Sequence, residues 1–471
     1  MSRDPAELWC LVSGRDWWLI RRVAERFTDA RVPDPGVRVL FAKQYRWQCW
    51  LDVEAALAAA EAECGVIPAA AAPVIQAAAR LADLDMGRIE RGIAETSHPL
   101  MALITELSMA AGENGGWVHW GATTQNITQT GDVLVLRAAH RRILRLIAGV
   151  LSAAADLAAH TADMLAAGRT HGQHAVPITF GFKPAGWIDE LDRHVTRLRS
   201  AEGRVFTAMT GGAAGTFASL GQAGPQVQDA VAARLGLTPM AVPSRAIADS
   251  FAEYVCILGL LGATGTRVAL EVYQLMKTEL GEASEPAPPG TVGSSTMPHK
   301  RNPQLSDDCI TIGAQLRALV PLALEGMLHD HENDGAHSAM LDDALQRACA
   351  LTGDLLVRLE VILSGLVVEP ARMRANLDLT GGMISSEAVM LGLGRAIGRQ
   401  IAHEVVYDAA RVEDTSFTEA IKRDPRVTAH LDAATIDRLL DPASHTGLSA
   451  DIARAAAQRA RATADGIRAG R

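Results

Sequence analysis

The sequence is poor in aromatic residues and has no paired cysteines. Aromatic residues make up only 4% of the 471 positions, and the six cysteines are scattered without any CxxC pair, so neither a disulfide framework nor a structural zinc site is indicated. Acidic residues (54) outnumber basic residues (45), which argues against a nucleic-acid partner. No stretch approaches the about 20 apolar residues of a membrane span, and the first 16 residues lack the pattern of a secretory signal. We therefore expect a cytoplasmic protein without a membrane or nucleic-acid partner.

Alanine and leucine are abundant instead. Hydrophobic residues make up 48% of the chain, and alanine runs such as 69–72 favour helices that pack closely through small side chains. Apolar residues recur at helical spacing between 46 and 63, where Gly65 would end the helix, and again in stripes at 188–198 and 355–363. Composition and periodicity together predict an all-α protein.

The chain is too long for one ordinary core, so we expect several domains. A tryptophan-rich opening (Trp9, Trp17, Trp18) comes first, and glycine-rich breaks follow near 111–116 and 364–365. We predict three consecutive domains: a helical domain at 1–115, a central domain of long helices at 116–364 with a loop at 290–305, and a helical cap at 365–471.

The most informative stretch is GSSTMPHKRNP at 293–303. It combines three hydroxyl groups, two fixed cations and an amide, and its glycine and prolines argue against a continuous helix. A serine such as Ser294 needs stabilised negative charge before it can act as a base. Lys300, Asn302 and the loop amides could hold a carboxylate that becomes doubly anionic in a transition state. The stretch predicts an anion-binding loop, although the same composition also occurs in plain surface turns.

Histidine and hydroxyl side chains meet in a second stretch, at 168–177. His171 could donate a proton to a leaving group near neutral pH, and the neighbouring Thr170 hydroxyl could hold a carboxylate. His171 and His174 are also spaced as metal ligands can be. No carboxylate or cysteine set accompanies them, so we expect no metal and no cofactor. A single histidine is more often structural than catalytic.

A third stretch, at 119–126, gathers hydroxyl and amide side chains in front of a long helical segment. Thr123, Thr124, Gln125 and Asn126 could by themselves form a helix N-cap. Beside the other two stretches, they are interpreted as a cradle for a substrate carboxylate.

The run at 293–303 resembles the signature of the fumarase/aspartase superfamily. The segment 41–54, with Arg46 in place, is similar to the first helix of the branch that contains adenylosuccinate lyase and 3-carboxy-cis,cis-muconate cycloisomerase. Further similar blocks lie at 96–99, 211–218, 278–286 and 398–404. The resemblance covers nearly the whole chain. It implies a three-domain, all-helical homotetramer whose central helices form a shared bundle and whose active sites each combine residues of three subunits.

The resemblance also implies an anti β-elimination, in which a base removes a proton next to a carboxylate before the group on the neighbouring carbon leaves. It assigns the base to Ser294, the general acid to His171 and a second catalytic histidine to His98. It assigns the binding of a substrate carboxylate to Lys300 and Asn302. For the whole small anionic dicarboxylate, we also expect binding by Arg46, Thr123, Thr124, Gln125, Asn126 and Thr170.

Several positions depart from the pattern of the family. Asn126 replaces a common aspartate, and Asp307 replaces a longer glutamate that would orient the acid histidine. Ala248, Ser250 and Asn333 stand where the family has arginine, and each lost charge-assisted contact would weaken polyanion binding by about 1.5–3 kcal/mol. We therefore predict a carbon–nitrogen lyase that releases fumarate from a small substrate, such as nitrosuccinate, hydrazinosuccinate or another N-substituted aspartate.

Two related activities and one other class remain as alternatives. A 3-carboxy-cis,cis-muconate cycloisomerase is favoured by the residues at 119–125 but opposed by the missing arginines, which also oppose an adenylosuccinate lyase. A catalytically silent, crystallin-like structural protein belongs to another class. The intact Ser294, Lys300 and His171 argue against it.

Overall fold

Helices account for almost all of the regular structure, as the composition predicted. The computed structural model describes residues 26–288 and 290–470, so the opening with Trp9, Trp17 and Trp18 lies outside the described residues. The α-helices are α2 (Lys43–Glu63), α3 (Ala71–Ala78), α4 (Met86–Thr96), α5 (Pro99–Ala110), α6 (Thr124–His160), α7 (Phe182–Val205), α8 (Gly224–Leu235), α9 (Asp249–Leu275), α10 (Gln304–Glu325), α11 (Gly335–Gly365), α12 (Pro370–Leu377), α13 (Ser386–Ile397), α14 (Arg399–Ala410), α15 (Phe417–Arg423), α16 (Pro425–Thr428), α17 (Ala433–Leu440) and α18 (Ser449–Arg468). The all-α prediction is confirmed.

Three two-stranded sheets accompany the helices in the described part of the chain. The sheets are an antiparallel hairpin of β1 (Leu165–Thr170) and β2 (Gln173–Thr179), a parallel pair of β3 (Thr207–Ala208) and β4 (Thr238–Pro239), and an antiparallel pair of β5 (Ala283–Ser284) and β6 (Val367–Val368). Of these sheets, only the β1–β2 hairpin has strands of more than two residues, and its turn carries His171.

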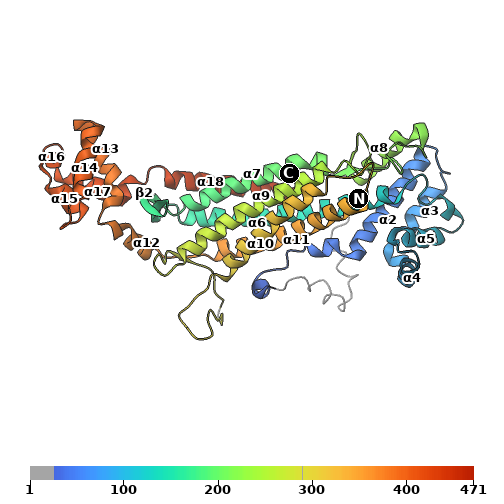
Figure 1. The fold of residues 1–471 in the computed structure, drawn as a ribbon, viewed down its shortest axis with the longest axis horizontal. Coiled ribbons are helices and arrows are strands. Elements are labelled where there is room, and N and C mark those ends of the chain that lie inside the picture. Colours follow the sequence, from blue (N-terminus) through green and yellow to red (C-terminus); the bar gives the residue numbers. More distant parts are fainter. Residues whose placement is uncertain (1–25, 289, 471) are drawn as a thin grey trace. The chain divides into compact units, whose positions relative to one another are not determined.

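The chain divides into two compact units, each of which combines three separate segments. Among the described residues, the first unit comprises those up to Leu146, His194–Ala263 and Ile312–Leu355, and the second comprises Ile147–Arg193, those within 264–311 and those from Leu356 onward. The long helices α6, α7, α9, α10 and α11 contribute residues to both units, and within each unit their segments lie side by side (Figure 1). The three consecutive domains expected from the sequence stay a prediction.

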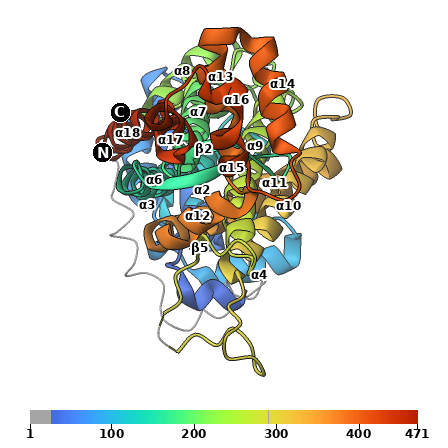
Figure 2. The ribbon, with the colours of Figure 1, turned by 90° about the vertical axis from the view of Figure 1, so that its left-hand side faces the viewer.

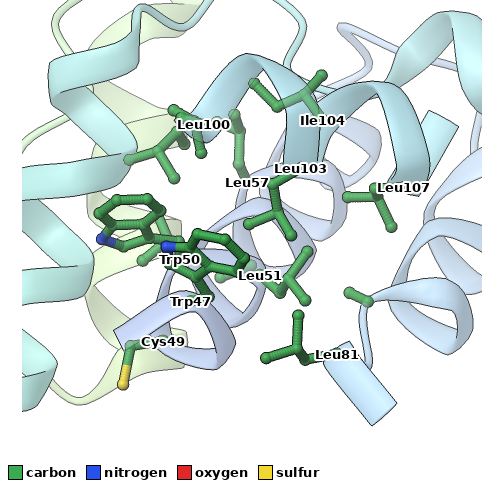
Figure 3. Close-up of a cluster of buried hydrophobic side chains, with 14 of the residues drawn as sticks. Trp47, Cys49, Trp50, Leu51, Leu57, Leu81, Leu100, Leu103, Ile104 and Leu107 are labelled. Carbon is green, nitrogen blue, oxygen red and sulfur yellow. The ribbon is translucent and has the colours of Figure 1, made fainter. Parts of the chain in front are cut away.

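In the first unit, α2 packs its apolar face against α5 (Figure 3). The helix ends at Glu63, as predicted. Trp47 of α2 is buried with Leu103 of α5. Full burial of a leucine side chain such as that of Leu103 contributes about 1.5–3 kcal/mol to folding. α6 approaches α2 closely because Gly131 has no side chain, and a Cβ there would lie 2.5 Å from Cδ1 of Trp50. This contact fixes the first turns of α6, which carry the predicted cradle.

In the second unit, the C-terminal helices α13 to α17 enclose a core of their own, in which Leu393 is fully buried (Figure 2). The β1–β2 hairpin is fastened to neighbouring segments of this unit. Ala167 of β1 is buried together with Leu377 of α12, and the backbone N–H of Thr179 donates a hydrogen bond to Oγ of Ser449 at 3.1 Å. The turn that carries His171 therefore projects from an anchored base.

Two helices of the fold are more apolar than expected. α6 and α9 each contain an 18-residue window that is long and apolar enough to cross a membrane by length and composition alone. In both helices 67% of that window is buried inside the structure. Their apolar residues therefore serve mainly as core.

Candidate active site

The signature loop, residues 290–303, connects β5 to α10 in the second unit and contains no helix. Oγ of Ser294 accepts two hydrogen bonds from the backbone of the same loop, from N of Met297 at 3.1 Å and from N of Thr296 at 3.3 Å. Hydrogen bonds to an oxygen favour its negatively charged form. The loop therefore holds the Ser294 oxygen where the conjugate base of its hydroxyl would be stabilised.

The two ends of the signature loop are joined by Asn302 and Gly293. Nδ2 of Asn302 donates to the carbonyl oxygen of Gly293 at 2.8 Å. Glycine is required there, because a Cβ would lie 2.0 Å from the carbonyl oxygen of Lys300. Asn302, which was predicted to bind substrate, thus also closes the loop, while Lys300 is exposed.

A buried carboxylate holds the beginning of α10, directly after the loop. The side chain of Glu285 accepts hydrogen bonds from N of Leu305 at 3.0 Å and from N of Ser306 at 2.6 Å. These are first-turn N–H groups, which have no partner inside the helix. Sequence reasoning missed this contact, because Glu285 lies about twenty residues before the helix start that it holds.

His171 lies in the turn of the β1–β2 hairpin. His171 and Gly172 are the two loop residues, with φ of 54° and 76°, as in a type I′ turn. A non-glycine residue in this conformation carries a strain of about 1–3 kcal/mol. Thr170 and His171 are both exposed, so the hairpin presents the two predicted site residues at its tip.

An ion pair next to this tip fixes the hairpin. The fully buried carboxylate of Glu282 accepts a hydrogen bond from Arg169 at 2.9 Å, a second from the same guanidinium, and one from Nδ2 of Asn376 at 2.7 Å. Burial raises the pKa of Glu282, but these hydrogen bonds outweigh it, and the pKa lies below its ordinary value. Glu282 is therefore an ionised anchor for Arg169, which directly precedes Thr170, and no sequence pattern had indicated this pair.

His174 pairs with Arg169 across the hairpin. Burial and the charge of Arg169 both lower the pKa of His174, which favours the neutral imidazole. Among the described residues, no group of three or more His, Cys, Asp and Glu side chains is arranged to hold a metal ion.

In the first unit, His98 and Thr124 come together although they belong to different sequence stretches. Nδ1 of His98 accepts a hydrogen bond from N of Met101 at 3.1 Å and so begins α5. The proton of the neutral ring must then be on Nε2, which lies 3.3 Å from Oγ1 of Thr124. The cap thereby selects the tautomer in which His98 donates toward the cradle.

The remaining cradle residues are held by backbone groups. Oδ1 of the buried Asn126 accepts from N of Thr123 at 3.0 Å and from N of Gly212 at 3.1 Å, and Nδ2 donates to the carbonyl oxygen of Gly212 at 3.4 Å. Nε2 of Gln125 donates to the carbonyl oxygen of Ala213 at 2.9 Å. Asn126 thus connects the start of α6 with the 211–218 segment, and its predicted contact with substrate stays a prediction.

Two arginines line a pocket in the first unit. Arg46, which was predicted to bind substrate, makes a two-point ion pair with Asp132, with Nε 2.6 Å from Oδ1. Nε of Arg245 donates to Oγ of Ser338 at 3.0 Å, and its guanidinium lies 3.5 Å from Asp342. Burial raises the pKa of Asp342, while Arg245 and Arg46 act in the opposite direction. Sequence reasoning did not single out Arg245.

A histidine–carboxylate pair lies at the start of the cradle stretch. Nδ1 of His119 is 2.6 Å from Oε1 of Glu54, which is buried, and His119 has φ of 59°. Backbone strain of this kind concentrates at functional sites. In the sequence, these two residues stood out only as members of the longer segments 41–54 and 119–126.

The roles inferred for individual side chains stay predictions. In the described residues of one chain, no hydrogen bond or ion pair joins Ser294 to His171, and none joins Asp307 to His171. Asp307 is exposed as a whole, but partial desolvation of its carboxyl, together with the charge of Asp308, raises its pKa. The structure thus holds the signature loop, the hairpin tip and the cradle each by separate contacts.

The comparisons with known proteins point to the same family as the sequence of the signature loop. A family model described as Lyase matches residues 29–317, and one described as Adenylosuccinate lyase C-terminus matches residues 382–456. An N-acetyl-S-(2-succino)cysteine lyase of Enterococcus italicus is 38% identical, over 88% of this chain and 92% of its own length. A 3-carboxy-cis,cis-muconate cycloisomerase of Pseudomonas aeruginosa is 38% identical, over 90% of this chain and 94% of its own length.

Solved structures give the same result. A fumarate lyase from Mesorhizobium sp. BNC1 superposes with a TM-score of 0.84 and 36% identity, covering 90% of this chain and 98% of the other. Family model, sequence relatives and fold all converge, and the chain therefore belongs to the fumarase/aspartase superfamily of lyases.

Proposed function

We propose that this protein releases fumarate from a small substituted succinate by anti β-elimination. The observation that carries the proposal is the Ser294 oxygen, which accepts hydrogen bonds from two amides of its own loop. A serine hydroxyl is a weak base until its charged form is stabilised, and preorganised N–H groups provide that stabilisation. Membership of a lyase superfamily supports the same chemistry.

In the proposed reaction, Ser294 takes a proton from the carbon next to a substrate carboxylate. The electron pair of that C–H bond moves into the carboxylate, which becomes doubly anionic and is held by Lys300 and Asn302. The pair then forms the double bond of fumarate as the bond from the neighbouring carbon to its substituent breaks. His171 gives a proton to the departing group, with Thr170 holding a carboxylate beside it.

The substituent is expected to be small. Ala248, Ser250 and Asn333 stand where related enzymes place arginine, so a phosphate or third carboxylate would find fewer cationic partners. This favours nitrosuccinate or a small N-substituted aspartate, with cleavage of a carbon–nitrogen bond. A second candidate is an S-substituted succinate, which is favoured by two relatives named N-acetyl-S-(2-succino)cysteine lyase, each 38% identical to this chain.

We also propose a homotetramer with composite active sites, in which the signature loop, the hairpin tip and the cradle come from different subunits. The support is membership of the superfamily, together with the separate contacts that hold each of the three groups. The small dicarboxylate would be the only ligand that the reaction needs.

The test is fumarate production from candidate substrates at equal concentration. We would compare nitrosuccinate, an N-substituted aspartate, an S-(2-succino) thioether, adenylosuccinate and 3-carboxy-cis,cis-muconate. Efficient fumarate release from one of the first three is expected. Efficient turnover of adenylosuccinate would overturn the small-substrate proposal, and lactone formation from carboxymuconate would assign the protein to the cycloisomerases.

A further inference from the structure

Arg245 lines a pocket in which it uses only part of its hydrogen-bonding capacity. The pocket lies within the first unit and is lined by side chains of α2, α6, α9 and α11, among them Arg46, Asp132, Ser338 and Asp342, and by Arg245 from the segment just before α9. The side chain of Arg245 is only 14% exposed, so it is largely removed from bulk water. A ligand that met it there would meet a nearly desolvated cation.

The two arginines of the pocket differ in how far they are neutralised. Arg46 has a two-point ion pair with Asp132, which uses the fork geometry of its guanidinium. Arg245 has one hydrogen bond, from Nε to Ser338, and a looser approach of 3.5 Å between Nη2 and Asp342. Among the described residues, nothing accepts a hydrogen bond from its Nη1. Arg245 is thus the cation of this pocket that can still receive an anion.

A chain of hydrogen bonds connects Arg245 with the cradle. Oγ of Ser338, which accepts from Arg245, lies 3.1 Å from Oδ1 of Asn333. Nδ2 of Asn333 in turn donates to Oε1 of Gln125 at 3.2 Å. The Arg245 pocket is therefore joined to the predicted carboxylate cradle through two intervening side chains, all within one unit.

We propose that Arg245 forms a subsite for one carboxylate of the leaving group. The pocket pairs two arginines with two aspartates, so it suits a monoanion and disfavours a phosphate dianion, which would face Asp132 and Asp342. Ala248 and Phe251 add apolar wall, which suits a short carbon arm next to the carboxylate. The ligand class is an amine or thiol that carries one carboxylate, as amino-acid derivatives do.

This inference rests on the proposed function, because the carboxylate belongs to the group that leaves the succinate. It also refines the argument from missing arginines. The positions of Ala248, Ser250 and Asn333 lack a cation, but Arg245 brings one back into the pocket that Ala248 lines. One negative charge on the leaving group is consequently accepted, whereas two or three are not.

Binding to the full-length protein tests the subsite without any reaction. Titration calorimetry would compare N-acetylcysteine with its carboxamide, which lacks only the charge. We expect the acid to bind at least about tenfold more tightly, and Arg245→Met to remove the difference. Arg234→Met, which removes a surface arginine paired with Glu63, is the matched control and should keep it. Equal affinity of the wild type for the acid and the amide would overturn the subsite. It would also be overturned if the Arg245→Met variant, with thermal stability equal to that of the wild type, still preferred the acid.

Kinetics separate this inference from the proposed function. Fumarate release would be measured from the S-(2-succino) adducts of the same acid and amide. Arg245→Met should lower kcat/KM about 10- to 100-fold for the acid adduct and leave the amide adduct within about twofold. If neither adduct releases fumarate but the acid still binds in a way that depends on Arg245, the proposed thioether cleavage is wrong and the proposed subsite is supported. If both react and Arg245→Met affects neither, the proposed function stands and the subsite fails.

Discussion

The signature loop and the cradle, which are both predicted to hold groups for an anionic substrate, are built in opposite ways. In the loop, Ser294 is held by amides two and three residues further along, so the arrangement is local. In the cradle, Thr124 meets His98 and Asn126 meets Gly212, which come from distant parts of the chain. The loop places its chemistry by its own backbone, whereas the cradle depends on the packing of α5 and α6.

Two buried carboxylates, Glu282 in the second unit and Glu61 in the first, differ in whether they have hydrogen-bond partners. Glu282 in the second unit has its charge matched by Arg169 and Asn376, and its pKa is lowered. Glu61 in the first unit is fully buried, and neither of its carboxylate oxygens has a hydrogen-bond partner among the described residues. The difference predicts that removing the charge of Glu282 lowers stability, whereas removing the ionisable group of Glu61 raises it.

The largest effect is expected from Ser294→Ala. Removing the proton acceptor should lower kcat by several orders of magnitude, and the thermal unfolding temperature should stay close to that of the wild type, because the side chain is partly exposed and bonds only to its own loop. Ser295→Ala is the control, since Ser295 is exposed and lies next to it. Turnover and unfolding are to be measured together. A Ser294→Ala enzyme that keeps most of its activity would place the base elsewhere.

The next prediction concerns composite sites. Ser294→Ala and His171→Ala should each be inactive, but mixing them under subunit exchange should restore activity in up to about a quarter of the sites, because some sites then draw both intact residues from different chains. Exchange is to be followed with two differently labelled variants. If labelled subunits mix and no activity returns, Ser294 and His171 act from the same chain.

The sequence predicted most of what is encoded locally. The helix ending at Glu63 is confirmed, and so are the core stripes in α7 and α11, where Ile188 and Leu355 are fully buried. The non-helical loop at 293–303 is also confirmed, because glycine and proline impose their own backbone geometry at short range. Patterns of one chain segment are sufficient for such features.

Features that depend on distant partners could not be predicted in the same way. The β1–β2 hairpin turns at His171 and Gly172, and this pair is not one of the Asn-Gly, Asp-Gly or Gly-Gly pairs that signal a type I′ turn, so the usual hairpin signal is missing. Glu282 meets Asn376, which is 94 positions away, and no periodicity announces such a pair. Arg245 belongs to no sequence motif, and its place in a pocket is seen only in the folded structure. Site residues of this kind become visible only once the chain is folded.

The contrast between Glu61 and Glu282 can be sharpened by pH. Burial, with Glu54 nearby, raises the pKa of Glu61 to about 9, so the folded state keeps this carboxyl neutral. Its contribution to stability is fully present below the ordinary glutamate pKa of about 4.3 and is lost progressively as the pH rises toward 9, by up to about 1.4 kcal/mol per pH unit.

Glu61→Gln keeps the shape and removes the ionisation. It should therefore raise the unfolding temperature at pH 8 clearly more than at pH 5.5, whereas Glu282→Gln, which breaks a satisfied ion pair, should lower it at both. Unfolding followed by circular dichroism at the two pH values is the measurement. Equal shifts for Glu61→Gln at both pH values would mean that the carboxyl is ionised or solvated in the folded protein.

The smallest effect is expected at Asn126 and decides whether this residue belongs to the scaffold or to the substrate site. Asn126→Ala leaves the N–H groups of Thr123, which is partly buried, and of Gly212, which is buried, without this acceptor, which should cost about 1–3 kcal/mol of unfolding free energy. Asn126→Asp keeps both acceptor bonds but buries a carboxyl whose second oxygen faces the carbonyl oxygen of Gly212, so it should also destabilise the protein, less so at low pH where the carboxyl is protonated, while its KM should be unchanged. A large rise in KM for Asn126→Asp at unchanged stability would instead give the side chain a direct part in substrate binding, and the cradle would then resemble the signature loop in holding chemistry rather than structure.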